Sequence, residues 1–122
     1  MKPLFHPSID DVSVAGILHA LSDPVRVQIF AKIACAKAAP SCSSFLHSGE
    51  REIPKSTLSQ HFKALREAGL IRGERSGLEL KNTSRCGEIE QRFPGLIPAI
   101  INAYRIEQAA KEAPARDRRP AA

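Results

Sequence analysis

The sequence predicts a mainly α-helical domain with one small β-hairpin. Over most of the chain, apolar residues recur every three or four positions, which is the period of a half-buried helix. After Gly69 the period changes to two, as in a β-strand. Proline, glycine and capping residues separate these segments at ordinary helix lengths. The 122 residues suffice for one domain and are too few for two.

Composition narrows the class of protein. A hydrophobic content of 43% and a charged content of 25% are typical of soluble globular domains. No apolar run approaches the roughly 20 residues of a membrane span, and the N-terminus lacks the apolar core of a secretory signal. We therefore expect a cytoplasmic protein with no membrane partner. The three cysteines, an odd number, do not predict a disulfide framework.

Two helices are expected in the first third of the chain. Ser8, followed three residues later by an aspartate, resembles a capping box and predicts a helix over about 8–21. Asp23-Pro24 supplies an N-cap and a proline at the first helical position, so a second helix should run over about 24–38. Residues 1–7 contain two prolines and are expected to be a flexible lead-in.

A short helix over about 42–48 and a longer one over about 54–69 should follow. On the longer helix, Leu58, Phe62 and Leu65 share one face, and Gly69 stands where a helix ends in the left-handed region. Two helices with a short link, the second polar outside, describe a helix-turn-helix. The outer face carries hydroxyls, an amide and an ammonium, which are groups that bind phosphate and base edges: Ser56, Ser59, Gln60 and Lys63.

A basic hairpin follows this helix. L-I-R-G-E-R reads as a strand and Ser76-Gly77 as a two-residue turn. In the returning strand, Leu78 and Leu80 alternate with charged residues. A basic hairpin directly after a polar helix predicts a wing that lies along the DNA backbone or in the minor groove.

The last helix, over about 94–112, is strongly apolar. It carries more apolar surface than a small helical core with one hairpin needs, so we expect it to form a two-fold homodimer. Residues 113–122 are polar, basic and proline-interrupted, and are expected to be a disordered tail. The expected dimer interface comprises Val14, Leu18, Phe93, Leu96, Ile97, Ile100, Ile101 and Tyr104.

The net charge of +5 is unevenly distributed. Residues 1–50 are neutral overall, residues 51–85 carry eight basic and four acidic side chains, net +4, and residues 86–122 carry net +1. The excess therefore lies on the polar helix and the hairpin, which favours a nucleic-acid partner.

The sequence resembles the ArsR/SmtB-type winged helix-turn-helix repressors. The matching stretches are A-L-S-D-P-V-R (20–26), S-T-L-S-Q-H-F-K-A-L-R-E-A-G-L-I (56–71) and R-F-P-G-L-I (92–97). The resemblance implies a homodimeric repressor that binds a pseudo-palindromic operator and releases it on a signal. Residues and resemblance together give these expected DNA-contacting positions: Lys55, Ser56, Thr57, Ser59, Gln60, His61, Lys63, Arg72, Arg75, Lys81 and Arg85.

The signal is left open. Metal-sensing members of this family carry a C-x-C pair before the recognition helix, whereas here the stretch reads S-C-S-S-F and keeps only Cys42, a weak candidate thiol. The last helix offers one carboxylate over residues 96–107, so no metal or other cofactor is expected. Release by a small-molecule inducer, by a metal as a minority hypothesis, or by thiol oxidation at Cys35, Cys42 or Cys86 stays open.

The sequence bears on two other classes of function. A winged helix can instead serve as a protein-interaction module without sequence-specific DNA binding, although the charge on residues 51–85 argues against it. An enzyme is not expected, because the sequence has no phosphate-binding glycine loop and no nucleophile–base pair at a readable spacing.

Overall fold

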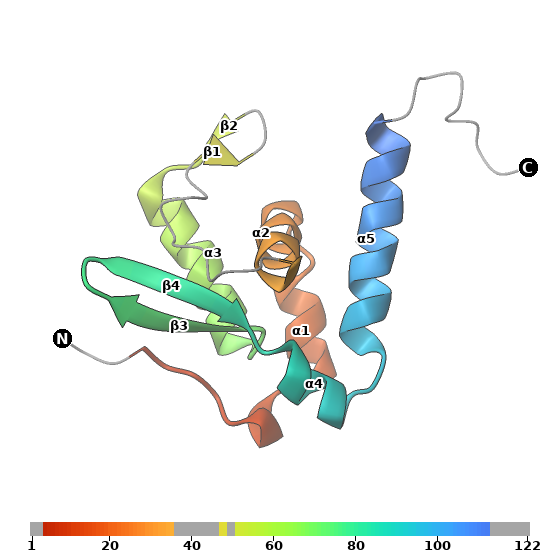
Figure 1. The fold of residues 1–122 in the computed structure, drawn as a ribbon, viewed down its shortest axis with the longest axis horizontal. Coiled ribbons are helices and arrows are strands. Elements are labelled where there is room, and N and C mark those ends of the chain that lie inside the picture. The colour runs from red at the N-terminus through yellow and green to blue at the C-terminus, as the bar shows by residue number, and fades with distance from the viewer. Residues whose placement is uncertain (1–3, 36–46, 49–50, 113–122) are drawn as a thin grey trace, which may run out of the picture.

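The computed structural model describes residues 4–35, 47–48 and 51–112, which form a helical domain with a projecting β-hairpin (Figure 1). The strands form two separate antiparallel pairs, β1 with β2 and β3 with β4. The mainly α-helical fold class with a small hairpin is thereby confirmed. The elements are η1 (Ile9–Asp11, a 3-10 helix), α1 (Val14–Ala20), α2 (Pro24–Cys35), β1 (His47–Ser48), β2 (Arg51–Glu52), α3 (Lys55–Glu67), β3 (Ile71–Ser76), β4 (Glu79–Ser84), α4 (Cys86–Arg92) and α5 (Leu96–Glu112).

The first predicted helix is divided in two. Ser8 caps η1, because its Oγ accepts a hydrogen bond from the backbone N–H of Asp10. Val12 and Ser13 are extended, and α1 begins after Ser13, whose Oγ accepts from the N–H of Gly16 at 3.0 Å. A single helix over 8–21 is therefore wrong: two serines each cap their own segment, and a buried Val12 separates them.

The second helix begins as predicted. Asp23 Oδ1 accepts hydrogen bonds from the N–H groups of Val25 at 2.8 Å and Arg26 at 3.2 Å, which is the geometry of an N-cap. The described part of α2 ends at Cys35. Its Ile29, Phe30 and Ile33 are buried and form the middle of the core.

The short third helix predicted over 42–48 is not helical at its described end. His47 and Ser48 form β1 and pair with Glu52 and Arg51 of β2. The next residue in the sequence is Gly49, and glycine is about 1 kcal/mol less favourable than alanine in a helix, which disfavours a helix at this end. Residues 42–46 of this prediction lie outside the described residues, as does the predicted tail.

Helix α3 ends where Gly69 was expected to end it. The N–H of Gly69 binds the carbonyl of Arg66 and the N–H of Leu70 binds that of Leu65, both at 3.0 Å, as in a Schellman motif. Gly69 has a φ of +83°, and a Cβ built on it would lie 2.3 Å from Cγ2 of Val12. Glycine is needed here for its conformation and for the close approach of η1.

The hairpin turn lies one residue later than predicted. Ser76 pairs with Glu79, so Gly77 and Leu78 form the two-residue turn. Gly77 has a φ of +63° and Leu78 does not have a positive φ, which is the pattern of a type II′ turn. The expected strand position of Leu78 is therefore wrong, and Leu78 stands at the tip.

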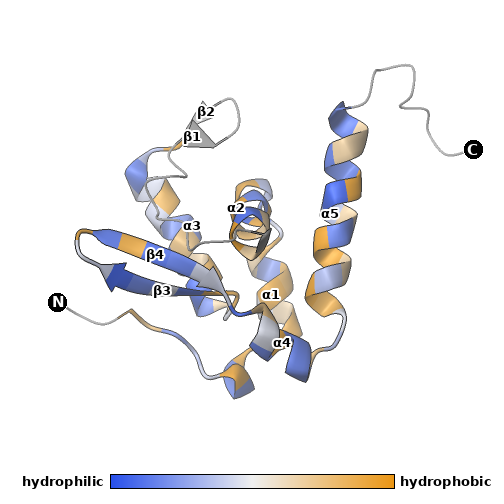
Figure 2. Cartoon of the chain, viewed as in Figure 1, coloured by the Kyte–Doolittle hydropathy of each residue, from blue (hydrophilic) through white to orange (hydrophobic). Residues whose placement is uncertain are grey.

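One core joins all the helices to the base of the hairpin. Its members are the buried apolar residues of α1, α2, α3, α4 and α5 together with Val12, Leu70 and Ile71. The predicted apolar face of α3 is confirmed, since Leu58, Phe62 and Leu65 are all buried. Figure 2 shows the hairpin largely hydrophilic, whereas apolar residues recur along α1 and α5. The core thus holds α3 by its apolar face and leaves its polar face outward.

Candidate nucleic-acid interface

The outer face of α3 is open to solvent. Ser56, Ser59, Gln60 and Lys63 are exposed, and so are Lys55 and Thr57 at the start of the helix. The carboxylate of Glu67 lies 3.8 Å from the ammonium of Lys63, with both side chains more than half exposed. A pair this exposed contributes little energy, so Lys63 is able to exchange its carboxylate for a phosphate.

His61 lies at the edge between the two faces of α3. It is half-buried, and its Nδ1 is buried without a hydrogen-bond partner among the described residues. The other ring nitrogen, Nε2, is therefore the one that can contribute a hydrogen bond at the surface. His61 therefore packs one edge of its ring against the domain and presents the other at the surface.

The hairpin carries its cations beside α3. Arg75 is exposed on β3, and Lys81 on β4 is half-buried, with its Nζ 2.9 Å from the Glu79 carboxylate. Figure 1 shows the start of α3 and the hairpin tip on the same side of the domain, with α5 on the other. The start of α3 and the part of the hairpin that bears Arg75 and Lys81 therefore lie on one side of the domain, with the two cations on opposite faces of the hairpin.

Arg72 and Arg85 are placed differently from these two cations. Arg72 is half-buried, and its Nη2 lies 3.4 Å from Glu88 Oε1. Arg85 is only 5% exposed, and its guanidinium binds Glu88 Oε2 at 2.6 and 3.0 Å and the carbonyl of Pro7 at 2.8 Å. The expectation that Arg85 is an outward wing cation is wrong, because its donors are used inside the domain.

Leu78 is a feature of this surface that the sequence did not reveal. Its side chain is fully exposed at the hairpin tip. Leucine is among the apolar side chains that minor-groove binding proteins insert between base steps. Because the predicted turn lies one residue too early, the sequence places Leu78 in the returning strand and not at the tip.

The expected dimer residues divide into two groups. Val14 and Leu18 on α1 are 40% and 52% exposed. Ile97 and Ile101 are buried in the core of the chain itself, so the expectation that they face a partner is wrong. The rest are half-buried: Phe93, Leu96, Ile100 and Tyr104.

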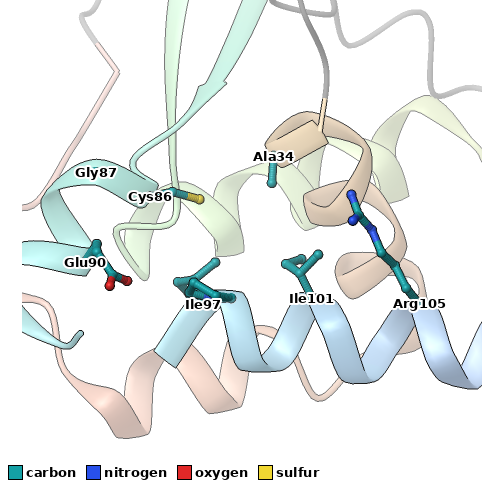
Figure 3. A pocket seen from close by; sticks show the side chains of 8 residues that line it. Ala34, Cys86, Gly87, Glu90, Ile97, Ile101 and Arg105 are labelled. Carbon is teal, nitrogen blue, oxygen red and sulfur yellow. The ribbon is translucent and has the colours of Figure 1, made fainter. Parts of the chain in front are cut away.

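A hollow of about 400 Å³ lies between α2, α4 and α5 (Figure 3). Ile97 and Ile101 project into it from α5, and Cys86, at the start of α4, directs its half-buried thiol toward it. Glu90 stands at one end and Arg105 at the other. The hollow is thus apolar in the middle and charged at both ends, and it lies on the α5 side of α2.

Within residues 4–35, 47–48 and 51–112, no group of three His, Cys, Asp or Glu side chains is placed to hold a metal ion. Cys42, the weak candidate thiol, lies outside these ranges. None of the helices in the described part of the chain combines the length and apolar character required to cross a membrane.

Comparisons with known proteins agree with this geometry. Residues 21–74, from the end of α1 to the middle of β3, match a family model described as a helix-turn-helix domain. No curated protein matches the chain. Among solved structures, the chain is similar to an ArsR-like transcriptional regulator from Rhodococcus sp. RHA1, with a TM-score of 0.55 and 23% identity over 80% of this chain and 89% of that one. Residues 21–74 are thus similar to a helix-turn-helix domain, and the chain shares the fold of this ArsR-like regulator.

Proposed function

We propose that this protein is a DNA-binding transcriptional regulator that acts as a homodimeric repressor and is released from DNA by an unidentified signal. One observation carries the proposal: the start of α3, whose outer face is exposed and polar, and the tip of the basic hairpin lie on the same side of the domain. Hydroxyls and an amide in the major groove, with cations along the backbone beside it, are the elements of winged-helix recognition. The ArsR-like fold supports the same proposal.

Within this surface the residues divide by chemistry. Gln60 carries the side chain best suited to pair with a base edge, because an amide can donate to and accept from adenine at once. Ser56 and Ser59 can hydrogen-bond to a base or a phosphate. Lys63 and Arg75 neutralise backbone charge, which positions the protein on DNA and makes its affinity dependent on salt.

Two substitutions test this division. Duplexes are first enriched from a random-sequence library on the wild-type protein, and affinity is then measured on the enriched and a scrambled duplex. We expect Gln60→Ala to lose about 1–3 kcal/mol on the enriched duplex alone. Arg75→Ala should weaken both duplexes alike and lower the slope of log affinity against log salt by about one.

Arg105→Ala is the matched control, because it removes the same charge from α5, away from the hairpin. It should leave both affinities unchanged. Equal losses on both duplexes for Gln60→Ala and Arg75→Ala would contradict the assignment of roles. If no duplex is enriched, or if binding does not depend on salt, the alternative of a protein-interaction module is favoured.

A further inference from the structure

Residues 4–12 lie along the hairpin and α4, where the sequence predicted a flexible lead-in over residues 1–7. Figure 1 shows this segment passing beside β3 before it reaches η1. Pro7 and Val12 are buried, and Leu4 and His6 are half-buried. The prediction is therefore wrong for residues 4–7, of which Leu4, His6 and Pro7 pack against the domain while Phe5 is exposed.

The segment makes its first attachment at Gly73 of β3. The N–H of Gly73 donates a hydrogen bond to Nε2 of His6 at 3.0 Å. Gly73 is buried, and a Cβ built on it would lie 3.0 Å from Cδ1 of Leu4. The absence of a side chain at Gly73 thus lets the segment approach the strand closely.

Two further attachments follow along the segment. The carbonyl of Pro7 accepts from Arg85 Nη1 at 2.8 Å, and Arg85 is joined through Glu88 to Arg72 of β3. The guanidinium of Arg92, at the end of α4, donates to the carbonyls of Ile9 and Val12. The segment is thus tied to the hairpin at its start and to α4 farther on.

The protonation state of His6 agrees with its role as an acceptor. Burial, and then the charges of Arg72, Arg66 and Arg85, lower the pKa of His6 below its ordinary value, and Glu74 opposes them. At neutral pH the ring is therefore uncharged, with its proton on Nδ1 and Nε2 free to accept from Gly73. A protonated ring could not accept this hydrogen bond.

We propose that residues 4–12 are a strap that sets the direction of the wing, and that His6 is its positioning residue, holding β3 where Arg75 reaches the DNA backbone. The proposal rests on the proposed function, since it concerns how the wing meets DNA. The strap also covers the edge of β3, which would otherwise offer free backbone groups to another strand.

The test compares His6→Ala with His6→Gln in the full chain. A glutamine places a carbonyl oxygen near the position of Nε2, so it keeps an acceptor, whereas alanine removes it. Amide hydrogen exchange at Gly73 is measured by NMR, and affinity is measured on the duplex enriched with wild-type protein. For His6→Ala we expect Gly73 exchange to rise and affinity to fall about five- to tenfold, the size of one hydrogen bond. His6→Gln should restore most of both.

Arg75→Ala is the control that distinguishes the position of β3 from the contact with DNA. It should weaken DNA binding with no change in Gly73 exchange. Wild-type exchange at Gly73 for His6→Ala would show that the hydrogen bond is not made, and would overturn the proposal. Faster exchange with unchanged DNA affinity would overturn the positioning role. If the wild type binds no duplex, the proposed function fails, and the exchange measurement still decides whether His6 holds β3.

Acid pH gives a second readout. As pH falls from 6.5 through the lowered pKa of His6, the wild type should lose Gly73 protection and DNA affinity together. His6→Gln cannot titrate at this position, so it should lack this part of the pH dependence. Identical pH profiles for the two proteins would contradict the role of His6.

Discussion

Glu88, in the first turn of α4, links this helix to the hairpin. Its two carboxylate oxygens face different arginines. Oε2 binds the buried guanidinium of Arg85, and Oε1 lies 3.4 Å from Nη2 of Arg72 on β3. The hydrogen bond from Arg85 is the main reason that the pKa of Glu88 lies below its ordinary value. A single carboxylate thus keeps one arginine inside the domain and restrains another at the wing.

Replacing Glu88 should make the stability of the protein less dependent on pH. A carboxylate with a lowered pKa contributes stability above its unfolded pKa of 4.5 and loses it as pH falls through the folded value. Because the side chain is 44% exposed, solvent screening limits this contribution to under about 1 kcal/mol.

Urea unfolding of wild type and Glu88→Gln at several pH values measures this effect. The variant should be less stable at pH 7, and the two free energies of unfolding should converge below pH 4. A difference that stays constant down to pH 3 would show that the charge of Glu88 is not what stabilises the fold.

At the scale of the elements, local signals located the start of α2 and the end of α3 and missed what distant contacts decide. Asp23 and Gly69 were read correctly, because a cap and a helix stop depend on residues within one turn. The hairpin turn was displaced by one residue, since Ser-Gly and Gly-Leu both place glycine at the turn. The packing of His6 on Gly73 joins positions 67 residues apart and has no local signature.

The same limits apply to the candidate interface. Helical periodicity placed the polar side chains of α3 on the exposed face, because this face is the complement of the buried one. Periodicity could not show that Arg85 turns inward, since that depends on the carbonyl of Pro7 and on Glu88. Charge counts alone therefore overestimated the number of outward cations on the wing.

The junction of η1 with α3 permits a matched test of a tertiary contact. Gly69 and Gly77 both have positive φ, so alanine at either position is strained by about 1–2 kcal/mol. A Cβ at Gly77 meets nothing within 4 Å, whereas a Cβ at Gly69 meets Val12. The difference between the two variants therefore isolates the contact with Val12.

We expect Gly69→Ala to lower the free energy of unfolding by about 1–3 kcal/mol more than Gly77→Ala, the usual cost of overpacking a core. Chemical denaturation of the two variants beside wild type gives both values. Equal losses would mean that Val12 and η1 can move away from Gly69 without lowering the free energy of unfolding.

At the scale of the whole molecule, the two sides differ in chemistry. The side with the start of α3 and the hairpin tip carries hydroxyls, an amide and cations. The exposed aliphatic residues of the helices lie instead on α1 and α5: Val14, Leu18 and Ile106. This separation is what a two-fold dimer on DNA requires, since its two recognition helices must enter successive major grooves about 34 Å apart.

A pair of leucine substitutions tests this arrangement. Leu18 on α1 and Leu78 at the hairpin tip are both exposed, so replacing either with aspartate should leave the core intact. If α1 contributes to the dimer, Leu18→Asp buries an unpaired carboxylate in the interface, and the protein should become monomeric at micromolar concentration. Leu78→Asp should stay dimeric and lose DNA affinity, because it brings a negative charge to the phosphates.

Light scattering coupled to gel filtration gives the mass of each variant, and titration with the enriched duplex gives its affinity. The monomeric Leu18→Asp variant should still bind one half-site weakly, since its α3 and hairpin are unchanged. A wild-type protein that elutes as a monomer, or a Leu18→Asp variant that elutes as a dimer, would remove α1 from the interface. Loss of dimerisation in Leu78→Asp would instead place the hairpin in the dimer interface. The hairpin would then not contact DNA beside α3.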